Sequence, residues 1–382
     1  MSSVTCSRSR FPRFLVTATV AAFIGATLLA GCEPITVSVA PDGRIAFSRE
    51  EGVFVVDLAK GQVQAIARPT KEQGQASVVS FSPDGSKLAY LLVKGDFELQ
   101  YSLMVHDTAS NKSEKVYAAT KPVLHVHWSP DGKWLSVGEA APSDDEIGGH
   151  LKLVSLDGKT VKTLAKQASL AHRWTADGKW VLAYTVDSKV GDRDVYKGAI
   201  SLIEVESGKP TKLASTVSGK EVYCDVTADG KEAVFLAMSA GPADAEAPAP
   251  GDGDEQWAFR FDGKTVTKLW SDATLFCRFS PDGKKVLGMA GSPVNLTIRD
   301  LASGKDTTLD KNVAAKASQE LVSVPVYPAF LPNGRVFYWK NKTTYGRTGS
   351  ALTAFTVDLE GKSAENAQIL IDKLVHDATK GG

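Results

Sequence analysis

The chain has 382 residues, 43% of them hydrophobic, and its 44 basic residues balance its 44 acidic residues to a net charge of zero. Such a chain lacks the excess of Lys and Arg that gives nucleic-acid-binding proteins their affinity, so nucleic acid is excluded as the expected partner. A chain of this length usually forms two or three domains, unless it is built from repeats that stack into a single body.

The first 31 residues have the composition of an export signal. Arginines stand at positions 8, 10 and 13, and an uncharged stretch then runs from residue 14 to residue 30. A basic start followed by a short apolar stretch is typical of a signal peptide, not of a spanning helix. The next residues, Leu29-Ala30-Gly31-Cys32, resemble the lipobox at which bacterial lipoproteins are acylated and cut. We expect a cleaved lipoprotein signal peptide over 1–31, a lipidated Cys32 and a short tether over 32–34; an ordinary secretory signal is the alternative.

The resemblance to lipoproteins implies a place in the bacterial cell envelope. A cysteine that carries several acyl chains holds a protein stably on a membrane. Glu33 follows the cysteine in place of the Asp that retains such proteins in the inner membrane, which favours the outer membrane, facing the periplasm, if the cell has two membranes. Cleavage would remove three arginines and no acids, so the mature chain would have 41 basic and 44 acidic residues.

A tight turn recurs seven times along the rest of the chain. Each copy follows an apolar segment and precedes another, and successive copies lie 42 to 53 residues apart. The turn dipeptides are Asp42-Gly43, Asp84-Gly85, Asp131-Gly132, Asp177-Gly178, Asp229-Gly230, Asp282-Gly283 and Asn333-Gly334. Further alternating segments and a second tight turn complete each unit, which indicates four short antiparallel strands per repeat.

The second unit, Phe81-Ser82-Pro83-Asp84-Gly85-Ser86-Lys87-Leu88-Ala89-Tyr90, resembles the Pro-Asp-Gly repeat of TolB-type, WD-like propellers. The fourth and fifth units have Ala in place of Pro, and the seventh has Asn in place of Asp. The resemblance implies an all-β fold: a seven-bladed β-propeller of four-stranded antiparallel blades over residues 35–374, with a C-terminal tail at 375–382. It leaves the function open, because propellers serve as scaffolds, receptors and enzymes.

The residues four positions before each turn form a polar set on the predicted inner strands. They alternate with an apolar layer, so they should face the central channel of a propeller. The set is Ser38, Ser80, His127, Arg173, Asp225, Arg278 and Ala329. We expect His127, Arg173, Asp225 and Arg278 to contact a small anionic ligand or an acidic side chain of a partner. The alternative is that these groups only satisfy one another.

Histidines and cysteines offer weaker signals. His125, His127 and His172 could be a fragment of a metal site, but no further ligands follow at a characteristic spacing, so we expect no metal and no cofactor. Cys224 and Cys277 occupy equivalent positions in neighbouring blades, and side chains at equivalent positions point the same way around the ring. This favours two free thiols over a disulfide.

Loop length varies most between the second and third strands of the blades, which should all lie at one end of the ring. The candidate contacts on this rim are Asp144, Asp145, Glu146, Asp192, Arg193, Tyr345 and Arg347. The Pro- and Ala-rich loop 241–254 is predicted to lack regular structure. A helix is predicted over residues 311–322.

These features favour a lipid-anchored envelope propeller that acts as a protein–protein interaction scaffold, as a monomer, for another envelope protein. One alternative is a receptor for a small ligand or glycan at the channel mouth, with Tyr223 and Tyr327 beside the charged residues. A propeller lyase or hydrolase is a further alternative. The sequence has no nucleophile elbow and no His-Glu-x-x-His motif, so we do not expect an enzyme, although scattered loop residues could still form a catalytic site.

Overall fold

The computed structural model describes residues 36–375 except 50–51, 69–73, 96–98, 144–147, 192–194, 220–221, 251–255, 272, 292–293, 315–327, 343–350, 369–370 and 374. The predicted signal peptide, Cys32 and the tether lie outside these residues. Within the described part of the chain, no helix has the length and apolarity needed to cross a membrane.

The described chain is all-β, with five four-stranded antiparallel sheets and one eight-stranded sheet. The first sheet contains β1 (Val37–Val39), β2 (Ile45–Arg49), β3 (Gly52–Asp57) and β4 (Gln62–Ala67). The second contains β5 (Gln75–Phe81), β6 (Lys87–Lys94), β7 (Gln100–Asp107) and β8 (Lys112–Ala119). In both, sequence neighbours pair in order, as expected for a meander of short strands.

The remaining four-stranded sheets belong to the second half of the chain. One contains β16 (Cys224–Val226), β17 (Ala233–Ala237), β19 (Trp257–Phe261) and β20 (Val266–Trp270). The next contains β21 (Ala273–Phe279), β22 (Lys285–Ala290), β23 (Val294–Asp300) and β24 (Asp306–Ala314). The last contains β25 (Ala329–Phe330), β26 (Val336–Lys342), β27 (Ala351–Val357) and β28 (Ala364–Asn366).

The eight-stranded sheet joins the third and fourth repeats through one long strand. It contains β9 (Val123–Trp128), β10 (Trp134–Ala140), β11 (Gly149–Ser155), β12 (Val161–Trp174), β13 (Trp180–Lys189), β14 (Tyr196–Glu204), β15 (Pro210–Ser218) and β18 (Ser239–Pro242). The first part of β12 pairs with β11 and its last part pairs with β13. One strand thus ends the third repeat and begins the fourth.

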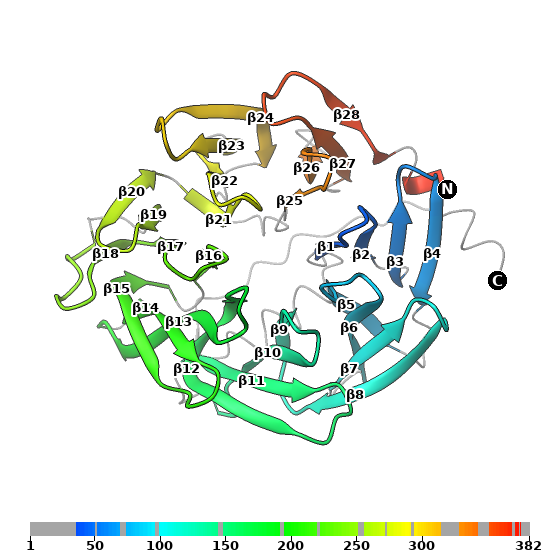
Figure 1. Cartoon of the computed structure of the whole chain (residues 1–382), viewed down its shortest axis with the longest axis horizontal. Helices are drawn as coiled ribbons and strands as arrows, with labels where there is room; N and C mark the ends of the chain where they lie inside the picture. Colours follow the sequence, from blue (N-terminus) through cyan, green and yellow to red (C-terminus); the bar gives the residue numbers. More distant parts are fainter. Residues whose placement is uncertain are drawn as a thin grey trace, which may run out of the picture.

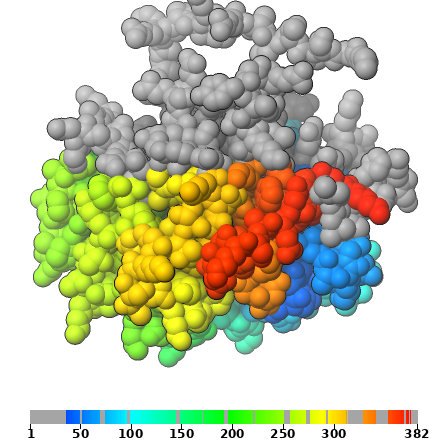
Figure 2. Space-filling model, turned by 90° about the horizontal axis from the view of Figure 1, so that it is seen from above, coloured from blue at the N-terminus to red at the C-terminus, as the bar shows by residue number. Residues whose placement is uncertain are grey.

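The sheets are arranged in a ring about a common centre, with β1, β5, β9, β16, β21 and β25 nearest to it (Figure 1). The last repeat, orange to red, lies directly beside the first, in blue (Figure 2). One hydrophobic core joins them, in which the ring of Phe47 meets that of Trp339 edge-on at 5.8 Å between centroids. This contact brings the two ends of the described chain together.

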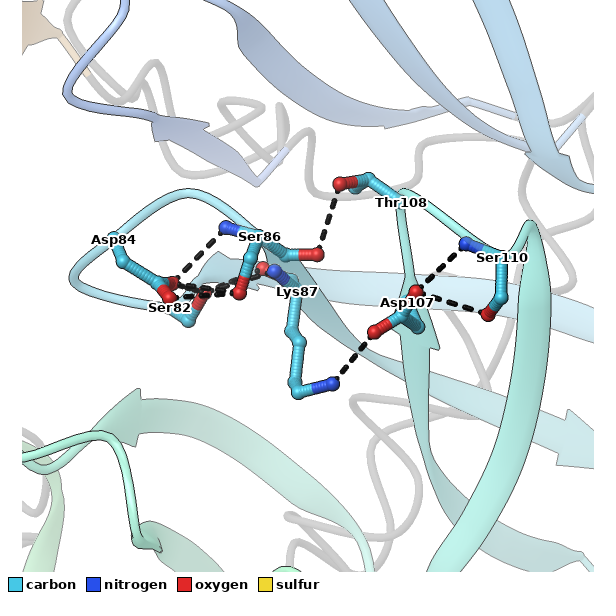
Figure 3. A network of polar contacts seen from close by, with 7 residues as sticks. All are labelled: Ser82, Asp84, Ser86, Lys87, Asp107, Thr108 and Ser110. Carbon is cyan, nitrogen blue, oxygen red and sulfur yellow. Dashed lines mark hydrogen bonds and ion pairs between the residues drawn. The ribbon is translucent and has the colours of Figure 1, made fainter.

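The seven predicted turns share one backbone geometry. In each, the glycine N–H donates to the carbonyl three residues earlier, over 2.8 to 3.0 Å. The glycines have φ between 68° and 89°, a region that side chains with a Cβ rarely adopt. In the second to sixth turns, a Ser or Thr hydroxyl also donates to the turn Asp, as Ser82 does to Asp84 over 2.6 Å (Figure 3). The first and seventh turns have Ala40 and Leu331 instead, and each is one residue shorter.

Three local predictions are wrong in part. Residues 241–242, in the loop predicted to lack regular structure, belong to β18, which pairs with β15. Residues 311–314 of the predicted helix belong to β24, while 315–322 lie outside the described residues. Val375, assigned to the tail, is buried with Ile371 in the core that the first and last repeats share. Each error has the same cause: packing against neighbouring strands or core residues overrides local composition.

Candidate functional site: a charged cluster on the inner strands

Four inner strands bring together the charged and imidazole side chains that the sequence singled out. β9 carries His125 and His127, β12 carries His172 and Arg173, β16 carries Asp225, and β21 carries Arg278. We call these six residues the inner-strand cluster. It contains all four residues predicted to contact a ligand or partner at the channel, namely His127, Arg173, Asp225 and Arg278.

Arg173 is the central connection of the cluster. Its guanidinium donates to Nε2 of His127 and, over 3.1 Å, to the carbonyl oxygen of His172. Its Nε lies 3.5 Å from Oδ1 of Asp225, a long ion pair. Because a guanidinium has only donors, the accepting Nε2 of His127 must be unprotonated. Arg173 is therefore held by three neighbouring groups.

Asp225 links two repeats as well as pairing with Arg173. Its Oδ2 accepts a hydrogen bond of 2.9 Å from the backbone N–H of Phe279 in the next repeat. Ser38 does the same in the first repeat, where its Oγ accepts from the backbone N–H of Phe81 over 2.9 Å. In both cases the accepting side chain stands four residues before the Asp of its own turn. The donating backbone N–H stands three residues before the Asp of the turn in the next repeat. Part of the predicted polar set thus has a structural role.

Arg278 differs from Arg173 because it forms no ion pair with a described residue, and Asp225 attracts it only from a longer distance. Its guanidinium carbon lies 5.4 Å from the centroid of the Phe276 ring. Among the described residues, no carboxylate lies within ion-pair distance of Arg278, and it donates no hydrogen bond. Burial, and then the positive charge of Arg173, lower the pKa of Arg278 to about 10. It stays protonated at neutral pH, so Arg173, Arg278 and Asp225 supply two cations and one anion to the cluster.

Burial keeps His125 and His127 uncharged at neutral pH, and His172 is held by a hydrogen-bonded serine. Burial lowers the pKa of His125 to about 3 and that of His127 well below its usual range, and nearby Arg173 adds to both effects. Nε2 of His172 lies 2.7 Å from Oγ of Ser136, which also accepts from Nε1 of Trp174 over 2.8 Å and donates to the carbonyl of His127 over 3.1 Å. Ser136 was missed by the sequence analysis, although it pairs directly with His127 across β9 and β10.

These contacts disfavour a metal site at the histidines. Nε2 of His127 accepts from Arg173 and Nε2 of His172 meets Ser136, so neither nitrogen is available to a metal ion. A cation would also be repelled by Arg173. Within the described part of the chain, no group of three His, Cys, Asp or Glu residues has metal-binding geometry.

Cys224 and Cys277 are both buried free thiols, as the sequence favoured. Burial raises the pKa of Cys224 to about 12 and that of Cys277 well above its usual value. A thiol with so high a pKa is a poor nucleophile at neutral pH. The two cysteines therefore contribute to packing and not to chemistry.

A pocket of about 530 Å³ opens at the turn end of the ring, between the fourth, fifth and sixth turns. Its lining includes four acidic residues, Asp225, Asp229, Glu232 and Asp282, together with Trp174 and Phe279, and no Lys, Arg or His. The acids already have partners: for example, Glu232 pairs with Arg260 at 2.7 Å. The pocket is thus acidic, while Arg173 and Arg278 lie on the inner strands beside it.

A second buried charge group, which the sequence did not reveal, joins the second and third repeats. Glu139 on β10 accepts from Lys152 Nζ and from the hydroxyl of Tyr117, each over 2.6 Å. Its other oxygen accepts from the backbone N–H and the hydroxyl of Thr120, over 3.1 and 3.0 Å. We call Glu139, Lys152, Tyr117 and Thr120 the Glu139 network.

The rim candidates cannot be placed in the same way. Asp144, Asp145, Glu146, Asp192, Arg193, Tyr345 and Arg347 lie outside the described residues, as does Tyr327. Tyr223 is described and lies beside His125, with 5.8 Å between ring centroids in an edge-on arrangement.

The ring matches known β-propellers in three dimensions. The β-propeller domain of the Trilobed protease from Pyrococcus furiosus is 16% identical, with a TM-score of 0.57 over 87% of this chain and 94% of that one. An acylaminoacyl peptidase is 14% identical, with a TM-score of 0.56 over 91% of this chain and 55% of that one. The chain has a β-propeller fold. At such identities the similarity concerns the fold alone.

TolB from Acinetobacter baumannii is also similar, at 17% identity and a TM-score of 0.48 over 90% of this chain and 82% of that one. No protein-family model and no curated protein matches the sequence. The propeller assignment therefore comes from the structure, and the TolB-type repeat is a resemblance of the turn sequences.

Proposed function

We propose that this chain is a seven-bladed β-propeller, anchored to a bacterial envelope by lipid on Cys32, that binds another envelope protein as a scaffold. Seven equivalent turns support seven blades, with β12 serving as the outer strand of the third and the inner strand of the fourth. The signal peptide over 1–31, the tether over 32–34 and the periplasmic face of an outer membrane belong to the same proposal, and rest on the sequence around Cys32.

The observation that carries the binding function is the unmatched charge of the inner-strand cluster. Arg173 pairs with Asp225, His125 and His127 are neutral, and no described carboxylate lies within ion-pair distance of Arg278. Arg278 is half-buried, and a cation that loses part of its hydration without a close anion is costly for the folded protein. An acidic group from outside would remove that cost, so the cluster favours binding of an acidic group.

Binding fits this cluster better than catalysis. Nε2 of His127 is engaged by Arg173 and Nε2 of His172 by Ser136, and the nearby thiols have raised pKa values. The second candidate function is a receptor for a small acidic ligand, because a free acid could reach a cation inside the ring as well as a partner could.

Crosslinking in intact cells, followed by affinity purification of the acylated protein, tests the scaffold. The wild-type chain is compared with a variant in which loops 141–150, 187–197 and 340–350 are shortened. As a matched control at the turn end of the ring, Lys133 and Lys231, 77% and 78% exposed, are changed to Ala. We expect one envelope protein to be captured by wild type and control and lost with the shortened loops. Capture of nothing by any form would refute the scaffold.

The anchor has its own test. Cys32→Ser should release the protein from the membrane fraction, because the acyl acceptor is gone. Labelling with a palmitate analogue should mark the wild type and not this variant. A Cys32→Ser protein that still sediments with membranes would contradict lipid anchoring at this residue.

A further inference from the structure

The two pockets at the turn end of the ring offer an approaching anion no basic side chain in their linings. The 530 Å³ pocket has four acidic residues in its lining and no basic one. A neighbouring pocket of about 370 Å³ is lined by Asp131 and Asp177, again with no basic residue. Lys133 and Lys231 pair with Asp131 and Asp229 at this end, so a negative ligand would meet carboxylates whose cations lie outside the pocket linings. The cations of the inner-strand cluster are therefore not presented to a ligand by these pockets.

Arg278, in contrast, extends away from the turns. Its guanidinium lies over Phe276, which stands two residues farther from the turn, or about 7 Å along a strand. His125 and Tyr223 occupy the corresponding positions, six residues before their own turns, and their rings are in contact. Both are partly accessible. The free cation therefore lies within a layer of rings on the side of the cluster farther from the acidic pockets.

From these two observations we infer that Arg278 binds a carboxylate that enters from the end of the ring opposite the Pro-Asp-Gly turns, beside His125 and Tyr223. The inference rests on the proposed function, because an acidic side chain of the bound partner is one source of that carboxylate. A free organic acid is the other source, with the same chemistry at Arg278.

Two features favour a single carboxylate over other anions. Arg173, Arg278 and Asp225 together carry one net positive charge, so one added negative charge balances these three groups, whereas a phosphate dianion would exceed that balance. A guanidinium also presents paired N–H groups that match the two oxygens of a carboxylate. Arg173 is the weaker candidate, because His127, the carbonyl of His172 and Asp225 already engage it.

Calorimetric titration of the purified acylated protein in detergent tests the carboxylate. The probes are propionate, a short end-blocked peptide with one glutamate, and the same peptide with glutamine. We expect no binding of the glutamine peptide. Binding of the glutamate peptide alone identifies a polypeptide source, and binding of propionate shows that a small acid suffices. If neither carboxylate binds, the inference is overturned.

Arg278→Met removes the charge and keeps the apolar stem, and it should weaken carboxylate binding at least about tenfold, as expected for loss of a charged hydrogen-bond partner. Lys112→Ala, an exposed residue on β8, removes the same charge elsewhere and should leave binding unchanged. Thermal melting establishes that both variants fold. Equal affinity for wild type and a folded Arg278→Met protein would assign the carboxylate to another site and overturn the inference.

The direction of approach has a separate readout. Asp229→Asn combined with Asp282→Asn removes two negative charges from the turn-end pocket while leaving acceptors for the turn hydrogen bonds. If the carboxylate enters from the opposite end, its association rate should stay within about twofold at low salt. A large increase would mean that it enters past the turns. Failure of these tests, with a partner still captured in cells, would leave the scaffold standing and remove only the role of Arg278.

Discussion

The Glu139 network and the inner-strand cluster are both groups of charges held inside the ring, and they are built in opposite ways. Glu139 has a side-chain exposure of 1%, and its oxygens receive hydrogen bonds from Lys152, Tyr117 and Thr120. Burial alone would raise its pKa, but the hydrogen bonds from Lys152 and Tyr117 lower it below its usual value. In the inner-strand cluster, Arg278 has the ring of Phe276 as its neighbour, and no carboxylate of the described residues lies within ion-pair distance of it.

The difference separates charges that hold the fold together from charges that remain available to a ligand. In the Glu139 network every strong donor has an acceptor inside the protein, so removing one member leaves the others unsatisfied. Removing Arg278 leaves no described acid without its partner. Variants in the Glu139 network should therefore lower stability more than binding, and variants at Arg278 should lower binding more than stability.

Glu139→Ala should have the largest effect on stability. It leaves Lys152, 17% exposed, without its anion, and it removes the acceptor for Tyr117 and Thr120. Loss of one partner of such a pair costs about 3 to 5 kcal/mol in free energy of unfolding. Denaturant titration, monitored by circular dichroism, measures this free energy of unfolding. Asp107→Asn, which breaks a more exposed pair with Lys87 on β6, is the control, with an expected cost below about 1 kcal/mol.

The effect of Asp225→Asn should be the next largest, at about 2 kcal/mol. The variant leaves Arg173 without its ion-pair partner and removes the negative charge that attracts Arg278 from a longer distance. The amide oxygen can still accept from the Phe279 N–H, so the link between the two repeats is kept. Added carboxylate should restore part of the lost thermal stability. A variant as stable as wild type would contradict the view that cluster charge limits stability.

His125 should make the fold sensitive to acid. Its pKa is about 3 in the folded protein, below the ordinary value of 6.5, so the unfolded chain takes up the proton first as the pH falls. Stability is therefore lost from about pH 6.5 downward until the folded protein is also protonated near pH 3, and the loss at pH 5 is about 1 to 2 kcal/mol. His125→Phe should flatten this part of the stability curve. An unchanged acid slope would mean that other groups produce it.

Much of the fold could be predicted from the sequence, because the turns depend on local rules. A glycine at positive φ after an Asp or Asn is readable in the sequence, and each of the seven glycines has that φ in the structure. The continuous β12 could not be predicted, because its two halves pair with different neighbours and that pairing is set by the ring. The same holds for β18, where Pro and Ala residues pair with the edge of β15.

The candidate site was predictable only in part. Counting four residues back from each turn identified Arg173, Asp225 and Arg278, since equivalent positions on inner strands lie side by side in a ring. This count does not predict which arginine lacks an ion-pair partner, because that depends on the direction of each side chain. Arg173 contacts His127 and Asp225, while Arg278 contacts Phe276. Ser136 and Glu139 carry no turn-related signal at all.

Arg278→Met should have the smallest effect on stability and the clearest effect on binding. No described carboxylate depends on Arg278, and removing a cation that also raises the positive potential around Arg173 relieves repulsion, so the free energy of unfolding should stay unchanged or rise by about 1 kcal/mol. Denaturant titration measures this alongside Glu139→Ala. A loss of more than about 2 kcal/mol would place Arg278 with the Glu139 network, as a charge that the fold itself requires. Unchanged stability together with lost carboxylate binding would mean that the protein keeps this cation for its ligand.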